Sequence, residues 1–212
     1  MLHKIWECFF PKGKFRLVNR KPISDCTIRP ITEEDFEQCE EIYKLNEPRH
    51  FPPGYFPQFS VWLRERHSFV VVIEQEHTIR AFGGINVDPH QDRQDASLTF
   101  GMAHPDYQKT GLGTTLLLSR LALLRRHSHP TFVCLSTVGG SESFYGRFGF
   151  RYIGAQQASP DYLQKTYYVR VSAEDASRCY AELKSLPFPL GFFEYDIPSA
   201  SKLQTSEVRV NA

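Results

Sequence analysis

The sequence has almost no excess charge of either sign and no long apolar run. Its 25 lysines and arginines stand against 24 aspartates and glutamates, which leaves a net charge of +1 over 212 residues. A general electrostatic attraction to nucleic acid or to an anionic membrane is therefore not expected. The apolar stretch near the N terminus is interrupted by Glu7 and ends at Pro11, too early for a signal sequence or a membrane span. We expect a soluble cytoplasmic protein with neither nucleic acid nor membrane as a partner.

Cysteine is present but forms no recognisable metal or disulfide pattern. The five cysteines are odd in number, widely spaced and include no C-x-x-C pair, and the histidines show no recurring ligand spacing. We therefore expect no metal site and a reducing compartment. The sequence also has no G-x-S-x-G elbow, so a serine hydrolase has no support. The cysteines are Cys8, Cys26, Cys39, Cys134 and Cys179.

The composition that remains is that of one globular domain, with 41% hydrophobic and 14% aromatic residues. Residues 1–24 lack sustained periodicity and residues 198–212 are polar, so we expect an N-terminal extension, a folded domain over 25–197 and a C-terminal tail. No repeat or low-complexity tract interrupts the domain.

Apolar periodicity and turn residues predict a mixed sheet with helices on its faces. Thr32 with Asp35, and Ser172 with Asp175, have capping-box spacing and open helices. The first of these helices should stop before Pro48. The expected strands are 26–31, 68–74, 79–87, 96–103, 131–138, 150–154 and 165–171, and the expected helices are 33–46, about 114–126, 142–148 and a last one that ends near Leu186.

A proline-rich segment, HFPPGYFPQF at residues 50–59, contains three prolines and a glycine and is expected to be a loop. Its four aromatic residues either pack into the core or line a pocket. The sequence leaves both interpretations open.

The stretch YQKTGLGT, residues 107–114, places two glycines between a strand and a leucine-rich helix. A glycine turn at a helix N terminus presents free backbone N–H groups and the positive end of the helix dipole, which together favour an anion such as phosphate. The ATP pattern GxxxxGK[ST] fails because no lysine follows Gly113, and the dinucleotide pattern GxGxxG fails at Leu116. The stretch does fit Q-x-x-G-x-G, at Gln108, Gly111 and Gly113.

Two further motifs give this pattern a context. FYGRFGF, residues 144–150, contains Y-x-x-x-G-F, and HPDY, residues 104–107, contains x-P-x-Y just before the glycine turn. With these motifs and its order of elements, the chain resembles the GNAT superfamily of acyl-CoA N-acyltransferases over about residues 26–155. The resemblance implies an α/β (α+β) fold, in which helices flank a mixed, mostly antiparallel sheet with splayed central parallel strands. It also implies transfer of an acetyl group from acetyl-CoA, the co-substrate, to a primary amine on a small molecule or peptide.

The resemblance also implies roles for individual residues. Tyr145 would protonate the departing sulfur of coenzyme A, a role that suits a phenol with an ordinary pKa near 10. Backbone groups of Met102 and Ala103 would contact the pantetheine arm. Lys109 either adds a charged contact or is a solvated loop residue. The pyrophosphate would be wrapped, mostly by backbone N–H groups, by Gln108, Lys109, Thr110, Gly111, Leu112, Gly113 and Thr114.

The sequence departs from the family pattern at two positions. Many members carry a glutamate five residues before the motif proline and an asparagine seven residues before the tyrosine, where this chain has Phe100 and Val138. The general base is therefore not identified: either the amine arrives neutral or loses its proton through water, or a residue from another element serves. A coenzyme A-binding module with little or no turnover is the alternative function, and a homodimer is compatible with the sequence. The candidate bases are Glu74, Glu76, Asp88, His90 and His104, the last of which is also readily explained as a solvent-facing loop residue.

Overall fold

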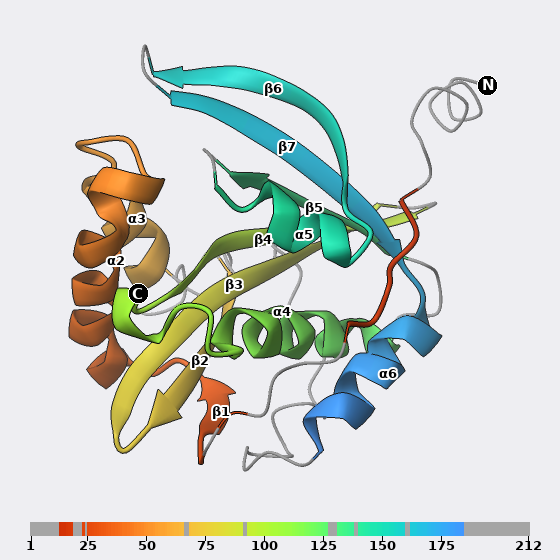
Figure 1. Cartoon of the computed structure of the whole chain (residues 1–212), viewed down its shortest axis with the longest axis horizontal. Helices are drawn as coiled ribbons and strands as arrows, with labels where there is room; N and C mark the ends of the chain where they lie inside the picture. The colour runs from red at the N-terminus through yellow and green to blue at the C-terminus, as the bar shows by residue number, and fades with distance from the viewer. Residues whose placement is uncertain are drawn as a thin grey trace, which may run out of the picture.

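The computed structural model describes residues 13–18, 23, 25–65, 68–90, 93–126, 131–137, 140–159 and 162–184. A seven-stranded sheet crosses this part of the chain in the order β1-β2-β3-β4-β5-β7-β6 (Figure 1). Every neighbouring pair is antiparallel except β4 and β5, which are parallel, so the expected mixed and mostly antiparallel sheet is confirmed. The strands are β1 (Thr27–Pro30), β2 (Phe69–Gln75), β3 (Thr78–His90), β4 (Arg93–Ala103), β5 (Thr131–Thr137), β6 (Arg151–Ser159) and β7 (Tyr162–Val171).

Helices cover both faces of the sheet. Figure 1 shows α2 and α3 side by side, apart from α4 and α6, and the packing agrees, because α2 contacts α3 while α4 contacts α6. The short helix α5 lies beside the curled pair of β6 and β7 (Figure 1). The helices are α2 (Phe36–His50), α3 (Phe56–Arg64), α4 (Leu112–Ala122), α5 (Glu142–Arg147) and α6 (Ala173–Leu183).

The strand β2 shows why both faces need cover. Its side chains alternate between the two sides of the sheet, as strand geometry requires. Val70 and Val72 pack in the cluster that contains α2 and α3, whereas Val71 and Ile73 pack in the cluster that contains α4 and α6. A continuous run of β-branched residues therefore occupies a strand that is buried on both faces.

The hairpin expected between residues 68 and 87 is confirmed. β2 and β3 pair antiparallel from Phe69↔Ile85 to Gln75↔Thr78. Glu76 and His77 form the two-residue connection with φ of 49° and 60°. Two successive positive φ values are what a tight hairpin turn of matching twist requires.

Two predictions that were based on prolines are wrong. The first helix passes through Pro48 and ends at His50, since a missing N–H removes only one bond near the last turn and Phe51 N–H still donates to Glu47 O at 3.0 Å. The segment 50–59, expected to be a loop throughout, already enters α3 at Phe56. Pro57 lies in the first turn of that helix, where its lack of an N–H costs nothing.

The expected ends of the other elements agree more closely. The capping box of Ser172 and Asp175 is present before α6, which ends at Leu183 rather than near Leu186. Gly149, at φ 88°, follows α5 as expected of a helix C-terminal glycine.

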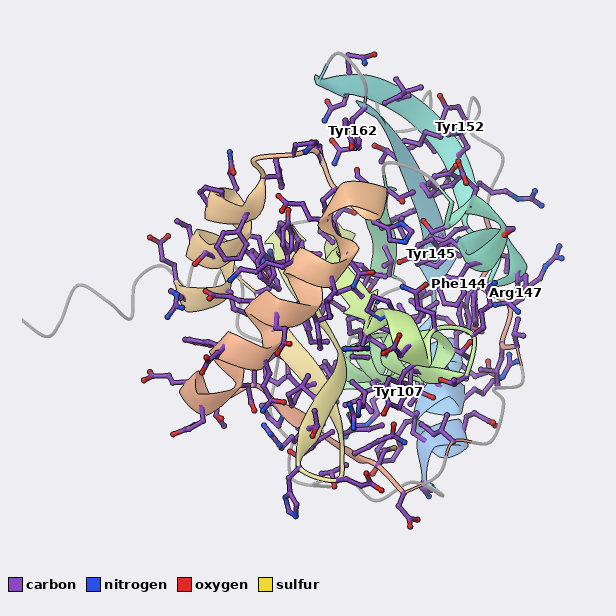
Figure 2. All side chains as sticks on the ribbon, turned by 60° about the vertical axis from the view of Figure 1, so that its left-hand side comes forward. Tyr107, Phe144, Tyr145, Arg147, Tyr152 and Tyr162 are labelled. Atoms are coloured by element: carbon purple, nitrogen blue, oxygen red, sulfur yellow. The ribbon has the colours of Figure 1, made fainter. Side chains whose placement is uncertain are left out.

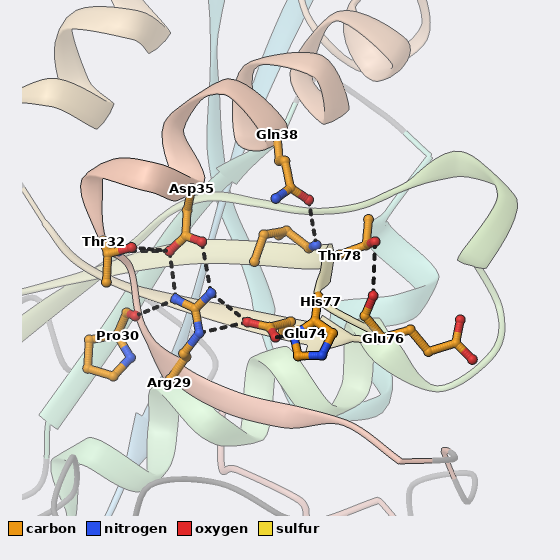
Figure 3. Close-up of polar contacts among 10 residues, drawn as sticks. Arg29, Pro30, Thr32, Asp35, Gln38, Glu74, Glu76, His77 and Thr78 are labelled. Atoms are coloured by element: carbon orange, nitrogen blue, oxygen red, sulfur yellow. Dashed lines mark hydrogen bonds and ion pairs between the residues drawn. The ribbon is translucent and has the colours of Figure 1, made fainter.

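A hydrogen-bonded cluster joins β1, β2 and the start of α2 (Figure 3). Arg29 donates to Asp35 at 2.6 and 2.8 Å and to Glu74 at 2.9 and 2.6 Å. The Asp35 carboxylate also accepts the Thr32 N–H at 2.8 Å, so the predicted capping box is present, although the first turn is 3₁₀ and α2 begins at Phe36. Burial acts to raise the pKa of Asp35, but the bonds from Arg29 and Thr32 outweigh it and hold that pKa below its ordinary value.

Part of the predicted N-terminal extension packs against the domain. Arg16 N–H donates to Phe148 O at 3.0 Å, and Arg170 N–H donates to Gly13 O at 2.9 Å. Phe15 is buried in the core and stacks on Phe148. The division of the chain at residues 24 and 197 stays a prediction.

Candidate functional site

The two parallel strands separate partway along their length. β4 and β5 pair from Gln94↔Thr131 to Leu98↔Leu135, and the pairing ends there although β4 continues to Ala103. A cavity of about 1150 Å³ lies at this opening. It is lined by residues 97–103 of β4, residues 134–137 of β5, the glycine turn, α5 and the C-terminal end of α2. The splayed parallel strands expected from the sequence are therefore present, and they create the site.

The glycine turn forms one side of this cavity. Gly111 has φ of 107°, a left-handed conformation that glycine adopts without strain, and α4 begins at the next residue. The first hydrogen bond into the helix is Thr115 N–H to Gly111 O at 3.0 Å. The geometry of a helix N terminus thus leaves the N–H groups of residues 112–114 without partners inside the helix. Together with the helix dipole they favour an anion.

Most of the predicted binding residues line the cavity. Thr110 and Leu112 do not: the Thr110 hydroxyl donates to Tyr107 O at 2.6 Å on the exposed side of the turn, and the Leu112 side chain is buried in the core. For these two, only the backbone is available to a ligand in the cavity. The predicted residues in the lining are Met102, Ala103, Gln108, Lys109, Gly111, Gly113, Thr114 and Tyr145.

Asn46, which the sequence analysis did not single out, fixes the turn to its surroundings. This buried side chain of α2 donates to Ile42 O at 2.8 Å and to Ala103 O at 3.2 Å, and it accepts from Gln108 Nε2 at 3.1 Å. It therefore ties α2, the end of β4 and the turn together. A polar residue on the buried face of a helix was the only available signal.

Tyr145 lies on α5, which lines the cavity beside the glycine turn: the ring of the preceding Phe144 faces Gly113. Its ring meets Phe144 edge-on at 5.0 Å and Phe150 at 5.5 Å between centroids, which fixes its plane. Figure 2 shows Phe144, Tyr145 and Arg147 together at α5, between the ribbons of α4 and of β6 and β7. Lys165 of β7 pairs with Glu142 at 2.8 Å and lowers the pKa of that carboxyl, so α5 is also held at its first turn.

Arg120, also missed in the sequence, lies on α4 with its side chain in the cavity wall. It is 2% exposed, and its guanidinium lies close enough to the Tyr145 side chain to interact with it. Burial lowers the pKa of this guanidinium, and the contact with Tyr145 opposes the shift. Arg120 is the one charged residue in the leucine-rich stretch TLLLSRLALL, residues 115–124, and a charge within such an apolar helix is the signal that could have identified it.

Aromatic side chains form the other end of the cavity. Between the pairs Phe82↔Met102 and Gly84↔Thr99, β4 has one residue more than β3, which makes a β-bulge. Phe100 lies in this bulge with φ of 41°. The Phe100 ring lies 6.1 Å from Phe51 and 6.4 Å from Tyr55, and all three line the cavity. It also packs on buried residues of α3. Both interpretations of the proline-rich segment therefore hold, each for different residues.

None of the described candidate bases lines the cavity. Glu74 is bound to Arg29, and Glu76 lies in the β2–β3 turn (Figure 3). His104 accepts the Asp106 N–H at 3.3 Å outside the cavity lining. The side chains of Asp88 and His90, and residue Val138, lie outside the described residues. Among the described lining residues there is no carboxylate, and the one imidazole is that of His50 at the end of α2.

The model of the acetyltransferase (GNAT) family matches residues 36–150, which include the opened strands, the glycine turn and Tyr145. The chain belongs to the GNAT acetyltransferase family. Acetyl transfer is thus the general activity that its membership supports.

Solved structures of GNAT enzymes share the fold at low sequence identity. Ard1 from Thermoplasma volcanium matches with a TM-score of 0.57 and 17% identity, over 69% of this chain and 98% of that one. The ribosomal-protein-S18-alanine N-acetyltransferase from Escherichia coli matches with a TM-score of 0.53 and 19% identity, over 69% and 94%. Arabidopsis thaliana Naa50, in complex with the bisubstrate analogue CoA-Ac-MVNAL, matches with a TM-score of 0.53 and 11% identity, over 68% and 97%.

Within the described residues, no three histidine, cysteine, aspartate or glutamate side chains gather as metal ligands would. No helix in the described part of the chain has the length and apolar character needed to cross a membrane.

Proposed function

We propose that this GNAT protein transfers an acetyl group from acetyl-CoA to a primary amine, with direct attack of the amine on the thioester and Tyr145 as general acid. The observation that carries the proposal is the placement of the glycine turn and Tyr145 on one cavity, at the point where β4 and β5 separate. A cytoplasmic location and a homodimer stay predictions from the sequence.

The cavity suits a long, anionic acyl donor. The N–H groups at the start of α4 suit its pyrophosphate, and Gly113 leaves room for close approach of the backbone. Within the part of the chain that the structure describes, β4 has no strand partner on its β5 side beyond Leu98, so backbone groups near Met102 and Ala103 are available to the amides of a pantetheine arm. Coenzyme A carries the acetyl group as a thioester, which supplies an activated carbonyl and a thiol leaving group.

Tyr145 completes the chemistry at the sulfur. As the amine nitrogen bonds to the carbonyl carbon and the carbon–sulfur bond breaks, the sulfur needs a proton, and the phenol donates it. The nitrogen loses a proton in turn, so the products are an amide and a free thiol. A positioned acid of this kind contributes roughly 10²–10⁴-fold to the rate.

The aromatic end of the cavity suits the acceptor. Phe51, Tyr55 and Phe100 come from the α2–α3 connection and the β4 bulge, and Tyr55 is 39% exposed, so this end opens to solvent. Aromatic walls favour an apolar group beside the amine, with a gain of about 1.5–3 kcal/mol for a fully buried side chain.

The described lining offers no carboxylate to deprotonate the amine, which favours an acceptor of low pKa. A peptide α-amine, with a pKa of about 7.7–8.0, is roughly a tenth neutral at pH 7, whereas an alkylamine with a pKa near 10.4 is neutral in fewer than about one molecule in a thousand. We therefore favour the α-amine of a peptide whose first side chain is apolar. The alanine substrate named for the Escherichia coli enzyme and the peptide analogue bound to Naa50 are consistent with this choice.

The test is thiol release from acetyl-CoA with an amine panel, run beside thermal stabilisation by acetyl-CoA. The panel contains peptides with apolar or charged first residues, arylalkylamines, polyamines and aminoglycosides. We expect stabilisation by acetyl-CoA and the fastest release with apolar-first peptides. Stabilisation without release from any amine would instead favour the coenzyme A-binding module.

Tyr145→Phe tests the acid, and Tyr152→Phe is its matched control. Tyr152 is a 52% exposed tyrosine of β6 that does not line the cavity (Figure 2). We expect Tyr145→Phe to lower kcat by about 10²-fold or more while acetyl-CoA affinity stays, and Tyr152→Phe to change neither. An unchanged kcat in Tyr145→Phe would rule out the assigned acid.

A further inference from the structure

Arg120 occupies a space that glycines on two neighbouring strands leave open. A Cβ added at Gly101 of β4 would lie 2.8 Å from both terminal nitrogens of the guanidinium, and one added at Gly83 of β3 would lie 3.0 Å from Nη1. Real Cβ atoms essentially never approach another heavy atom as closely as 2.8 Å, and a contact at 3.0 Å is unusually tight. The absence of side chains at these two positions is therefore what lets the guanidinium lie under the bulge of β4.

This buried cation has no carboxylate partner among the described residues. Its Nε donates to Leu116 O at 3.3 Å and its Nη1 to Gly84 O at 3.4 Å, both long bonds, and the Tyr145 side chain lies close enough to interact with it. An arginine keeps its charge at any pH a protein experiences. Burying a charge without a paired carboxylate is costly, and packing alone would be served better by an apolar side chain of similar volume.

The location of Arg120 points to the use of this charge. Arg120 of α4 and Tyr145 of α5 line the same cavity, at the opening of β4 and β5. A guanidinium has only donors, so in a hydrogen bond between these two side chains the phenol oxygen must accept. The phenol proton is then left free to be donated elsewhere.

We propose that Arg120 is a positioning residue for acetyl transfer, one that fixes the Tyr145 oxygen by donating to it and stabilises the phenolate that forms when the proton passes to the departing sulfur. The inference rests on the proposed function. Tyr145 then regains a proton, either from solvent or from the nitrogen that has been acetylated, and this can happen before or after the thiol leaves. A fixed cation is effective at this point because the site is buried and little of its field is screened.

A double-mutant cycle separates this role from a merely structural one. We expect Arg120→Met to lower kcat by about 10- to 150-fold, the range for loss of a hydrogen bond to a charged group, with the Kd for acetyl-CoA unchanged. In the Tyr145→Phe background, the same substitution should lower kcat by less than about threefold, because the group it acts through is gone. An equal loss in both backgrounds would overturn the proposal, because Arg120 would then act on the reaction directly or through the fold.

Stability and a conservative variant supply further readouts. We expect Arg120→Met to unfold at the same or a higher temperature than wild type, because it removes an unpaired buried charge. Arg120→Lys should recover part of the lost kcat, since it keeps the charge. If the methionine variant does not fold, Arg120→Gln replaces it in the same double-mutant cycle. A lower unfolding temperature together with no rescue by lysine would assign Arg120 to the fold and overturn the proposal.

One measurement is independent of turnover and so distinguishes failure of this inference from failure of the proposed function. With ring-labelled tyrosine, the carbon NMR signal of Tyr145 is assigned by its loss in Tyr145→Phe. We expect that signal to move in Arg120→Met while the signal of Tyr152 stays. A stationary Tyr145 signal would refute the contact, whether or not any amine is acetylated.

Discussion

Gly113→Ala separates the fold of the glycine turn from its use. Gly113 lies in the first turn of α4, and its φ is not positive. A Cβ there would meet only the Phe144 ring, at 3.7 Å, an ordinary contact. Alanine at this position therefore fits the free protein without steric strain. A bound pyrophosphate does, because the methyl group would stand between the anion and the N–H groups at the start of the helix.

The two effects have opposite signs. Alanine in place of a helical glycine stabilises by about 0.5–1 kcal/mol, which for a protein of this size raises Tm by roughly 1–4 °C. Loss of one hydrogen bond to a charged phosphate costs about 1.5–3 kcal/mol, which weakens acetyl-CoA binding by about 10- to 150-fold. A variant that is more stable and binds less tightly is the expected outcome.

Thermal unfolding without ligand and isothermal titration with acetyl-CoA measure the two quantities. Gly154→Ala is the matched control, since a Cβ on this β6 residue meets nothing within 4 Å, and it should leave the affinity unchanged. Gly111→Ala is the contrasting variant, because its φ of 107° makes alanine cost about 1–2 kcal/mol in the free protein. Wild-type affinity in Gly113→Ala would refute the assignment of this turn to the pyrophosphate.

Three other substitutions test the surroundings of the site. Gly149→Ala should lower the free energy of unfolding, measured with urea, by about 2–4 kcal/mol, because Gly149 has φ of 88° and an added Cβ would meet the carbonyl oxygen of Lys14. A loss below about 0.5 kcal/mol would contradict the observed packing. Asp35→Asn should lose about 1.5–3 kcal/mol at pH 7. The pKa of Asp35 is lower in the folded protein than in the unfolded chain, so the stability that its carboxylate contributes is present above an unfolded pKa of about 3.9 and is lost as the pH falls through the folded pKa. The free energies of unfolding of wild type and variant, measured with urea, should therefore converge in acid. A difference that does not change with pH would contradict the role of the Arg29 pair. Phe100→Ala should reduce kcat/KM for the best apolar amine by about 10-fold while acetyl-CoA affinity stays, and an unaffected kcat/KM would remove Phe100 from the acceptor site.

Local signals predicted much of the fold. The β2–β3 hairpin, the glycine turn before α4, the capping box of Ser172 and the glycine after α5 all depend on residues within a few positions of one another, and all are present. The same local reasoning failed at Pro48 and Pro57. Each of these prolines lies near a helix end, where the missing N–H matters little, and only the packed structure locates that end.

The candidate site was predicted only in part, because half of it is assembled from distant residues. The motifs located Tyr145 and the turn, whereas the space around Arg120 depends on glycines of β3 and β4 that come together only through strand pairing. The register of that pairing, and the bulge at Phe100, follow from contacts between strands and not from any one segment. Asn46 was not predicted for the same reason, because its partners in β4 and in the glycine turn are 57 and 62 positions away in the chain.

The packing of Phe15 on Phe148 has a consequence for the order in which the chain is made. The N-terminal segment around Gly13 and Lys14 lies beside Arg170 of β7, one of the last strands to be synthesised. During translation the backbone hydrogen bonds between this segment and Arg170 can form only after β7 has been synthesised. The contacts with Phe148, the residue that follows α5, need a shorter chain, so the segment beside the helix that carries Tyr145 can be bound in two stages.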